Sequence, residues 1–416
     1  MPRDFWKFLT GQTISTLGSA FSAFALPLLV FQLTHSPLSL AITTITFALP
    51  HLLFGLFIGA WVDRVDRKRL MIVVDILLAL TVITIPVLAI LHLLNVWWVY
   101  AVQFTVSSLV LVFEQAEFTA IPSLVGSNDL VTANGRINAT YQGSEVAGPA
   151  IAGAIANVVS VPALLVIDAI SYLVSATALA TIKVSFNRTD LAKKRATRIL
   201  ADIGEGIRYV LSHPVLRNIS LMMMLFNLTN VTLYAQGVYY AKERLHVNNF
   251  ELGLFFASGS VGAIAFSLIA GRLRKRFSFS AVVIGCLALS GVATIAFAAV
   301  PWLWAALPLL FLREGLLSLL NINTFSLRQV IVPDHMLGRV LSVAGVLAFS
   351  ALPIGSIAGA LLIERTHNIA LVFGGIGVLL ILIPLAFSFT ALGHADRYLP
   401  AKTAEDAEAT EPADAT

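Results

Sequence analysis

Residues 59–70 read GAWVDRVDRKRL, a short charged turn that separates two long apolar stretches of the chain. Each stretch has the length, about 20 residues, that a helix needs to cross the hydrocarbon core of a membrane. Similar stretches follow on both sides of the turn. The 416-residue chain is 58% hydrophobic and only 12% charged, with a mean hydropathy of +0.86, and this balance is not that of a soluble domain. We therefore expect an all-α membrane protein.

The apolar stretches predict twelve transmembrane helices in two pseudo-symmetric sets of six. In the first half they cover residues 12–32, 38–62, 70–92, 97–121, 138–160 and 162–184. In the second half they cover residues 214–241, 252–271, 279–299, 302–325, 339–363 and 368–391. The predicted domains are an N-terminal six-helix bundle (1–184), a cytoplasmic linker (185–213), a C-terminal six-helix bundle (214–391) and a disordered cytoplasmic tail (392–416).

The tail and the linker differ in what their sequences predict. From Ala401 onward the tail has no large apolar residue, so it lacks the surface that a folded segment must bury. Within the linker, the stretch from Asp202 to Leu211 has apolar residues at helical spacing. This spacing suits a short interfacial helix and a solvated connector equally well.

The two halves carry matching residues at similar offsets. Gly59 and Gly271 lie 212 residues apart, and Pro122 and Pro333 lie 211 residues apart. A third match pairs Asn134-Gly135-Arg136 with Leu337-Gly338-Arg339. Similar offsets in separate pairs predict a parallel six-helix repeat, which places a substrate path between the two halves.

Basic residues predict the orientation in the membrane. Of the 27 Lys and Arg residues, 23 fall on one side of the predicted spans, and cytoplasmic loops carry the excess of positive charge. Both termini and the linker are therefore expected in the cytoplasm of a multi-pass cell (plasma) membrane protein. The isoelectric point of about 9.2 does not indicate nucleic-acid binding, because the basic residues lie in short turns. The expected partners are the lipid bilayer and a small-molecule substrate, with the chain acting as a monomer.

Catalytic and metal motifs are absent from the sequence. The single cysteine, Cys286, lies in an apolar stretch and fits a small core residue. The sequence has no His-Glu-x-x-His zinc pair and no Gly-x-x-x-x-Gly-Lys phosphate loop. We therefore expect no catalytic residues, no metal site, no cofactor and no enzymatic activity.

The charged turn resembles the signature loop of the major facilitator superfamily. The resemblance implies a conformational latch that holds the outward-facing state, with a carboxylate of the fourth span as the partner of the arginines. The latch residues are Gly59, Asp63, Arg64, Arg67 and Glu117. Charges at a helix N-terminus and between facing side chains form bonds that break when the halves rock. Asp66 departs from the pattern, since many members carry glycine there, and the alternative is that all these charges only anchor the topology.

A second motif lies in the fifth span, where Gly148-Pro149-Ala150-Ile151-Ala152-Gly153 resembles the Gly-Pro motif of exporting drug:proton antiporters. The motif residues are Gly148, Pro149 and Gly153. Proline bends a helix and small residues allow close packing, which together would seal the path; a packing kink without bearing on direction is the alternative. Segments 168–172, 216–217 and 327–334 extend the resemblance over nearly the whole chain to the macrolide-efflux and siderophore-exporter branch.

Charged residues inside the spans are costly and are therefore functional candidates. The candidates for proton coupling or for the cavity are Glu145, Asp168, Arg313 and Glu314. Arg313 lies about 15 Å from either end of its span, near the midplane. The adjacent Arg313 and Glu314 are expected to point about 100° apart and to use different partners. Each candidate is alternatively a structural ion pair or a helix brace.

Polar and aromatic residues at helical spacing predict an amphipathic cavity. The candidates are Phe24, Asn227, Asn230, Tyr234 and Gln236. The predicted function is secondary active transport, namely proton-coupled efflux of a drug, macrolide or similar amphiphile by alternating access, with H+ as the coupling ion. The alternatives are an exporter or flippase for a siderophore or lipid, and a membrane scaffold that does not transport.

Overall fold

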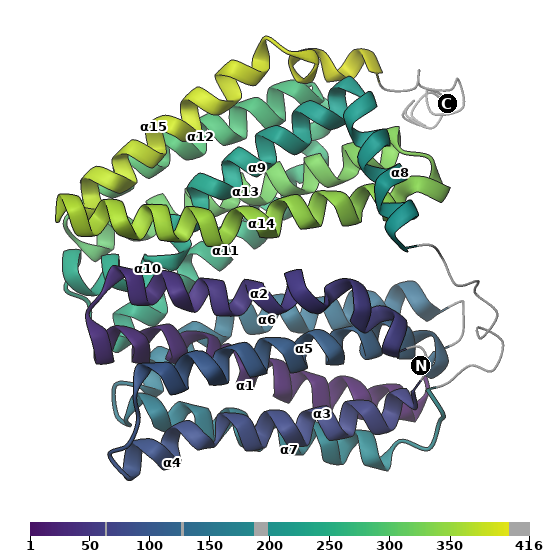
Figure 1. The fold of residues 1–416 in the computed structure, drawn as a ribbon, viewed down its shortest axis with the longest axis vertical. Helices are drawn as coiled ribbons and strands as arrows, with labels where there is room; N and C mark the ends of the chain where they lie inside the picture. The colour runs from purple at the N-terminus through teal and green to yellow at the C-terminus, as the bar shows by residue number, and fades with distance from the viewer. Residues whose placement is uncertain (63–64, 126–128, 187–198, 399–416) are drawn as a thin grey trace, which may run out of the picture.

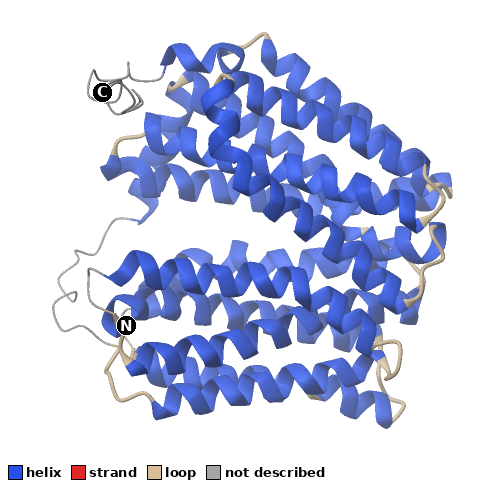
Figure 2. Cartoon of the chain, turned by 180° about the vertical axis from the view of Figure 1, so that it is seen from behind, coloured by secondary structure: helices blue, strands red, loops and turns tan. Residues whose placement is uncertain are grey.

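The structure is a computed structural model that describes residues 1–62, 65–125, 129–186 and 199–398 as a bundle of long helices (Figure 1). The first half contains α1 (Arg3–Thr34), α2 (Pro37–Val62), α3 (Arg67–Val82), α4 (Thr84–Ile90), α5 (Val96–Leu124), α6 (Leu130–Ile155) and α7 (Val161–Thr181). The remainder contains α8 (Ile199–Ser212), α9 (Pro214–Ala235), α10 (Gly237–Tyr239), α11 (Asn249–Arg276), α12 (Phe279–Ala299), α13 (Leu303–Ile331), α14 (Asp334–Thr366) and α15 (Ile369–Ser388). A π-helical turn covers Tyr240–Arg244 and a 3-10 helix covers Ala391–Tyr398. Figure 2 shows the loops gathered at the two ends of the molecule.

Local sequence signals set the ends of many helices. Side-chain oxygens that accept a backbone N–H cap the N-termini of α3, α5, α11, α12 and α15, and these capping residues are Asp66, Asn95, Asn248, Ser278 and Asn368. At the C-termini of α1 and α14, His35 and His367 adopt the left-handed conformation that ends a helix, with φ of 48° and 50°. The residue at position 66 that departs from the family pattern therefore has a structural role, because it caps α3.

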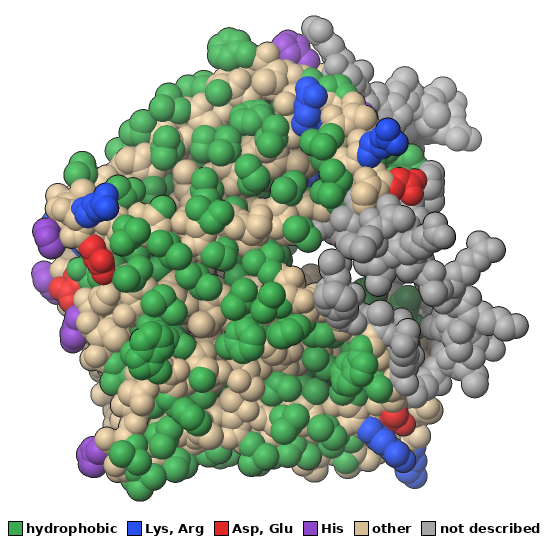
Figure 3. Space-filling view, in the orientation of Figure 1, with side chains coloured by type: hydrophobic (Ala, Val, Ile, Leu, Met, Phe, Trp, Pro, Cys, Tyr) green, Lys and Arg blue, Asp and Glu red, His purple; other side chains and the backbone are tan. Residues whose placement is uncertain are grey.

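Ten helical segments in the described part of the chain are long and apolar enough to cross a membrane. One of them joins α3 and α4, which are separated only at Ile83. The helices α6 and α9 complete the predicted set of twelve, although both contain several Asn and Thr residues that lower their hydropathy. Figure 3 shows charged side chains at two opposite ends and a hydrophobic belt between them. The twelve-helix membrane fold is confirmed.

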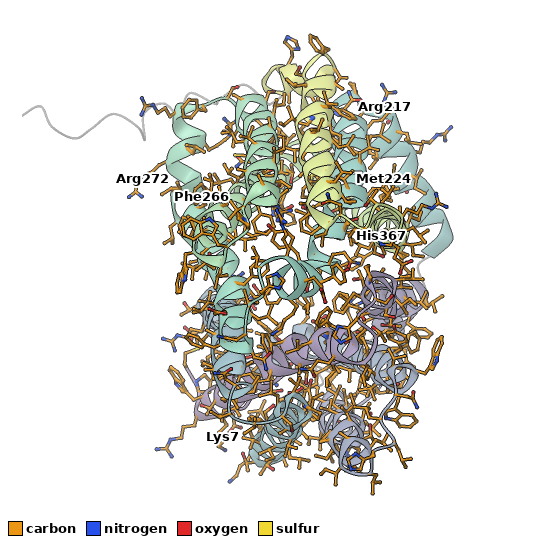
Figure 4. All side chains as sticks on the ribbon, turned by 90° about the vertical axis from the view of Figure 1, so that its left-hand side faces the viewer. Lys7, Arg217, Met224, Phe266, Arg272 and His367 are labelled. Carbon is orange, nitrogen blue, oxygen red and sulfur yellow. The ribbon has the colours of Figure 1, made fainter. Side chains whose placement is uncertain are left out.

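Helix packing repeats from one half to the other. Within the first half, α5 packs against α2 and α3, α7 against α1 and α3, and α6 against α1. Within the second half, α13 packs in the same way against α11 and α12, α15 against α9 and α12, and α14 against α9. The halves meet through α2 with α14 and α6 with α11, which are equivalent pairs. In Figure 4 the helices are seen roughly end on in two groups, with Lys7 in one group and Met224 and Phe266 in the other.

The start of the predicted disordered tail is wrong. Residues 391–398 form the 3-10 helix, in which Leu392 and Ala395 are fully buried against α12. The Ser280 hydroxyl donates to the Leu392 carbonyl at 2.7 Å, and it accepts from the Ala395 N–H at 3.0 Å. Burial of Leu392 and Ala395 and the two Ser280 hydrogen bonds hold this segment in place. The stretch from residue 399 onward lies outside the described residues.

The predicted linker contains a helix, α8. Its Val210 is buried in a small apolar cluster with Leu216 of α9 and with residues at the start of α14, including Met336. Ile207 and Leu211 of the same helix remain exposed. The linker helix is therefore attached to the second half, with one apolar edge uncovered.

Candidate functional site

The two ends of the molecule differ in how the halves meet. We call the end that carries Arg3 and Tyr398 the terminal face, and the other end the opposite face. Near the opposite face, the Gln236 side chain donates to the Pro37 carbonyl at 2.8 Å, and the Asn249 side chain donates to the Ala156 carbonyl at 2.9 Å. Each of these hydrogen bonds crosses from one half to the other. The opposite face is therefore sealed.

Further polar pairs join the halves in the turns of the opposite face. Ser36 donates to Glu364 at 3.3 Å, and a His35 ring nitrogen lies 3.7 Å from a Glu243 oxygen. Lys242 supports the seal, because it donates to the Asn249 side chain at 2.8 Å. Partial burial lowers the pKa of the Lys242 ammonium. These exposed or half-buried pairs fix the relative position of the turns but stabilise the seal only slightly, since a surface ion pair contributes about 0–1 kcal/mol.

Two glycines bring α6 and α11 together near the same face. A Cβ on Gly153 would lie 2.5 Å from the Asn249 carbonyl oxygen and 2.9 Å from Gly253 Cα. Gly253 in turn faces the Pro149 carbonyl, and Gly148 packs against Ala20 of α1. The predicted motif residues Gly148, Pro149 and Gly153 thus lie in close packing contacts, and the one around Gly153 joins the halves. The partner Gly253 was not among the predicted residues, although a glycine four residues after a helix start is a readable signal.

A hollow lies between the halves beneath this seal. Tyr234, near the end of α9, is 76% exposed even though the residues around it in sequence, such as Leu233 and Ala235, are buried. The carboxylates of Glu145 on α6 and Glu314 on α13 both lie near enough to Tyr234 to interact with it electrostatically. Glu145 and Glu314 belong to different halves. Tyr234 therefore faces an internal space between the halves that has a carboxylate on each wall.

Arg313 forms the polar support of this hollow. Its Nε donates to the Thr294 hydroxyl at 3.1 Å, and its two terminal nitrogens bond to Glu314 and Asn230. The expectation that Arg313 and Glu314 use different partners is wrong, because the flexible arginine side chain bends back onto its neighbour. Arg313 is 4% exposed, whereas the Glu314 side chain is 36% exposed. Arg313 thus braces α13 against α9 and α12, and Glu314 reaches the hollow.

Three predicted cavity residues lie elsewhere. Gln236 is fully buried in the seal, and Phe24 is buried within the first half. Asp168 is also fully buried, where it accepts hydrogen bonds from Ser22 and Ser171 between α1 and α7. Burial places these three side chains outside the cavity, because hydropathy patterns do not distinguish the face toward a bundle core from the face toward a cavity. Proton coupling at Asp168, the other role considered for this residue, stays a prediction. Asn227 is half-buried on α9.

Part of the predicted latch can be described. Arg67 is buried, and its Nη1 lies 3.2 Å from the Phe186 carbonyl and 3.4 Å from the Thr119 carbonyl. Glu117 accepts from the Tyr141 hydroxyl at 2.6 Å, so α5 is tied to α6 at this point. The second Glu117 oxygen is buried without a hydrogen-bond partner among the described residues. Asp63 and Arg64 lie outside the described residues, and so do the surroundings of Gly59.

Toward the terminal face, α5 and α13 present equivalent exposed surfaces. Both helices have 29 residues, and exposed residues of α5 recur in α13 at a constant offset of 207. The matched exposed pairs are Trp97 with Trp304, Ala101 with Pro308, Thr105 with Leu312, Glu114 with Asn321, and Phe118 with Phe325. The step of nine residues between the third and fourth pairs turns a helix by about 180°. Each helix therefore exposes one side near the opposite face and the other side near the terminal face.

The exposed sides near the terminal face are the walls of an opening. Phe325 lines a cavity of about 450 Å³ together with Met223 of α9 and Arg328. Glu114 interacts electrostatically with His51 of α2, whose ring touches the second half. Figure 3 shows the molecule hollowed between the halves toward this end. His51 was not predicted, although an ionisable residue within an apolar span is a signal that sequence alone provides.

Comparison with known proteins agrees with this architecture. The chain is 28% identical over 359 residues to the multidrug efflux pump Tap of Mycolicibacterium fortuitum, covering 82% of this chain and 84% of Tap. It is 25% identical over 378 residues to macrolide efflux protein A of Streptococcus pyogenes, covering 87% of this chain and 89% of that protein. Its fold matches a solved bacterial homologue of the iron transporter ferroportin in an inward-facing state, with a TM-score of 0.74 at 17% identity, over 93% of this chain and 99% of that chain.

The family assignment covers almost the entire chain. The profile of the family described as transmembrane secretion effector matches residues 3–411. That span includes both halves, the seal and the hollow between them. The chain belongs to the transmembrane secretion effector family of the major facilitator superfamily, and it is a multi-pass membrane transporter rather than an enzyme.

Proposed function

We propose that this chain exports an amphiphilic organic cation in exchange for protons by alternating access. The observation that carries the proposal is the hollow in which Tyr234 faces Glu145 of one half and Glu314 of the other. These two carboxylates and the Arg313 guanidinium leave one net negative charge. A carboxylate beside an exposed aromatic ring is a suitable environment for an organic cation with an apolar body.

An anionic siderophore or phospholipid fits this hollow less well. Its negative charge would lie near Glu145 and Glu314, while Arg313 is already bonded to Glu314, Thr294 and Asn230. The relatives named as a multidrug efflux pump and a macrolide efflux protein also favour an amphiphilic drug-like substrate and outward transport. A scaffold without transport activity would not require a cavity with charges on both walls.

The proposal includes an orientation in the cell membrane with both termini in the cytoplasm. Most Lys and Arg residues fall on the terminal face, which is the usual cytoplasmic bias. With this orientation, the conformation described here is sealed toward the outside and open toward the cytoplasm. Because one chain supplies both walls of the hollow, we propose that the monomer is the transporting unit, with H+ as the coupling ion.

Removing either cavity carboxylate should weaken recognition of a cation. In proteoliposomes, Glu145→Gln and Glu314→Gln are expected to raise the KM for ethidium export about tenfold, equivalent to about 1.4 kcal/mol, because the attraction to the cation is lost in a site of reduced dielectric. Ethidium fluorescence measures the rate. Asp129→Asn is the matched control, because Asp129 directly precedes α6 at the terminal face and its side chain is 49% exposed.

Two results would count against this substrate class. If both glutamine variants export ethidium with the KM of the unmodified chain, the hollow does not bind the cation. If the unmodified chain moves ethidium no faster than empty liposomes, while a neutral or anionic amphiphile is exported, the charge of the cargo is wrongly assigned. The control variant distinguishes a local effect from a general loss of negative charge on α6.

A further inference from the structure

His51 lies at a contact between the two halves, about 21 Å along α2 from its first residue. Its ring stacks on Phe349 of α14, with centroids 5.1 Å apart and an interplanar angle of 6°. Its Nδ1 lies 3.3 Å from the Phe47 carbonyl oxygen, one turn earlier in α2. Placing an ionisable imidazole at this depth in a membrane costs free energy, so a histidine here is a candidate for a functional role.

Glu114 is the charged group that interacts with His51. It lies on the exposed side of α5 that faces the opening, and its electrostatic partners include His51. Other ionisable groups on helices that pack against α2 are either tied to another residue or lie at a helix end. On α5, Glu117 binds Tyr141, and Tyr100 binds the Ser39 carbonyl. The described helix-end groups are Arg3, Asp4 and Lys7 on α1, Arg217 and Tyr234 on α9, and Glu364 and Arg365 on α14. Within the described residues, Glu114 is therefore the carboxylate that faces this histidine.

The tautomer of His51 follows from its hydrogen bond. A carbonyl oxygen only accepts, so Nδ1 carries the proton that is donated to Phe47. Nε2 then holds a lone pair, and it is the atom that takes up a second proton. The resulting imidazolium would lie over the Phe349 ring and near the Glu114 carboxylate, and both neighbours stabilise a positive charge.

We propose that His51 and Glu114 form the binding site of the transported proton, and that proton uptake stabilises the conformation sealed at the opposite face. This inference rests on the proposed function and adds the location of the coupling ion. Phe349 belongs to the second half, so the contact that stabilises the imidazolium also ties α2 to α14. By linkage, whichever conformation keeps the stack binds the proton more tightly and is favoured by it.

The direction of the cycle follows from this linkage. A proton that enters from the acidic outer side returns the empty chain to the conformation open toward the terminal face. Loss of that proton to the more alkaline cytoplasm removes the positive charge over Phe349, which frees the halves to rock with the substrate bound. The proton therefore moves inward for each cation moved outward, with no net charge movement for a one-to-one exchange.

The test separates exchange from uphill transport. The unmodified chain is reconstituted in liposomes with the membrane potential held at zero, and ethidium is the probe. One pH unit should support an ethidium gradient of about tenfold in a one-to-one exchange. His51→Phe keeps an aromatic ring against Phe349 but binds no proton, so we expect a gradient near one, while ethidium-for-ethidium exchange stays within about twofold because it needs no proton.

Two further variants make the outcome decisive. Glu114→Gln should lower the gradient in the same direction, and the double variant should be no worse than His51→Phe, because the two groups form one site. His92→Asn should keep the gradient, since His92 is an exposed histidine in the turn between α4 and α5, within one half, and asparagine tolerates its positive φ. A pH-driven gradient retained by both His51→Phe and His51→Gln would overturn the proposal. If the unmodified chain forms no gradient, proton coupling itself fails, and that result is distinct from a gradient that survives without His51.

Discussion

A bifunctional thiol reagent is expected to stop ethidium export when it joins cysteines introduced by Phe118→Cys and Phe325→Cys. The two phenylalanines occupy equivalent positions in α5 and α13, each six residues before the end of its helix, and they are 76% and 46% exposed on the walls of the opening. In the proposed alternating access, rocking of the halves brings these walls together. A covalent tie then removes one of the two conformations that alternating access requires, so export should fall at least about tenfold.

The chain offers a clean background and a matched control for this experiment. Cys286 is the single cysteine, and it is buried, so Cys286→Ser removes the native thiol. Thr105→Cys with Leu312→Cys is the control pair, because these residues are also equivalent and exposed but lie on the other sides of the same helices. The control pair should neither crosslink nor lose export, and a reducible reagent should restore export to the Phe118/Phe325 pair. Crosslinking of that pair without loss of export would contradict the proposed closure.

Gly153→Leu is expected to weaken the seal at the opposite face. A Cβ at this position would lie 2.5 Å from the Asn249 carbonyl, so α6 and α11 must separate. Overpacking of this kind costs about 1–3 kcal/mol, which lowers the population of the sealed conformation about tenfold to a hundredfold. Ethidium export should fall accordingly. In a Cys286→Ser background, Gln236→Cys, buried in the seal, should react faster with a maleimide that cannot cross the membrane.

Gly143→Leu is the control for Gly153→Leu on the same helix. No atom lies within 4 Å of a Cβ built on Gly143, so a side chain is accommodated there. Both variants should elute as single species of the same size, which separates a local change in the seal from unfolding. Equal maleimide rates for Gly153→Leu and the unmodified chain would show that close packing at Gly153 does not control access.

The sequence predicted the membrane helices well because the bilayer imposes one length and one polarity on every span. The repeat was also visible, since glycine and proline mark the same turns in both halves. Even α6 and α9, which are more polar than the other spans, were placed by their apolar stretches. The 3-10 helix at Ala391–Tyr398 was missed because its two buried apolar residues, Leu392 and Ala395, are too few to form a hydrophobic pattern.

Side-chain partners were predicted less well for a physical reason. A charged residue inside a span either pairs with another group or faces water. The sequence around the residue does not show which of these two environments it has. Asp168 accepts hydrogen bonds from serine hydroxyls within the first half, and Arg313 binds the adjacent Glu314. Glu145 and Tyr234, in contrast, face the hollow. Gln236 carries a side chain suited to a substrate site, yet it bonds to a carbonyl of the other half. These choices depend on contacts between helices that are distant in the sequence.

The equivalent helices α5 and α13 carry a duplicated shape but not duplicated chemistry. The positions of Glu114 and Glu117 in α5 are equivalent to those of Asn321 and Thr324 in α13. The first half therefore carries carboxylates where the second half carries neutral side chains. The two halves therefore differ in chemistry at equivalent positions of one shared fold. Under the proposed function, substitutions that alter cargo selection around Arg313 and substitutions that alter proton binding at Glu114 fall in different halves of the chain.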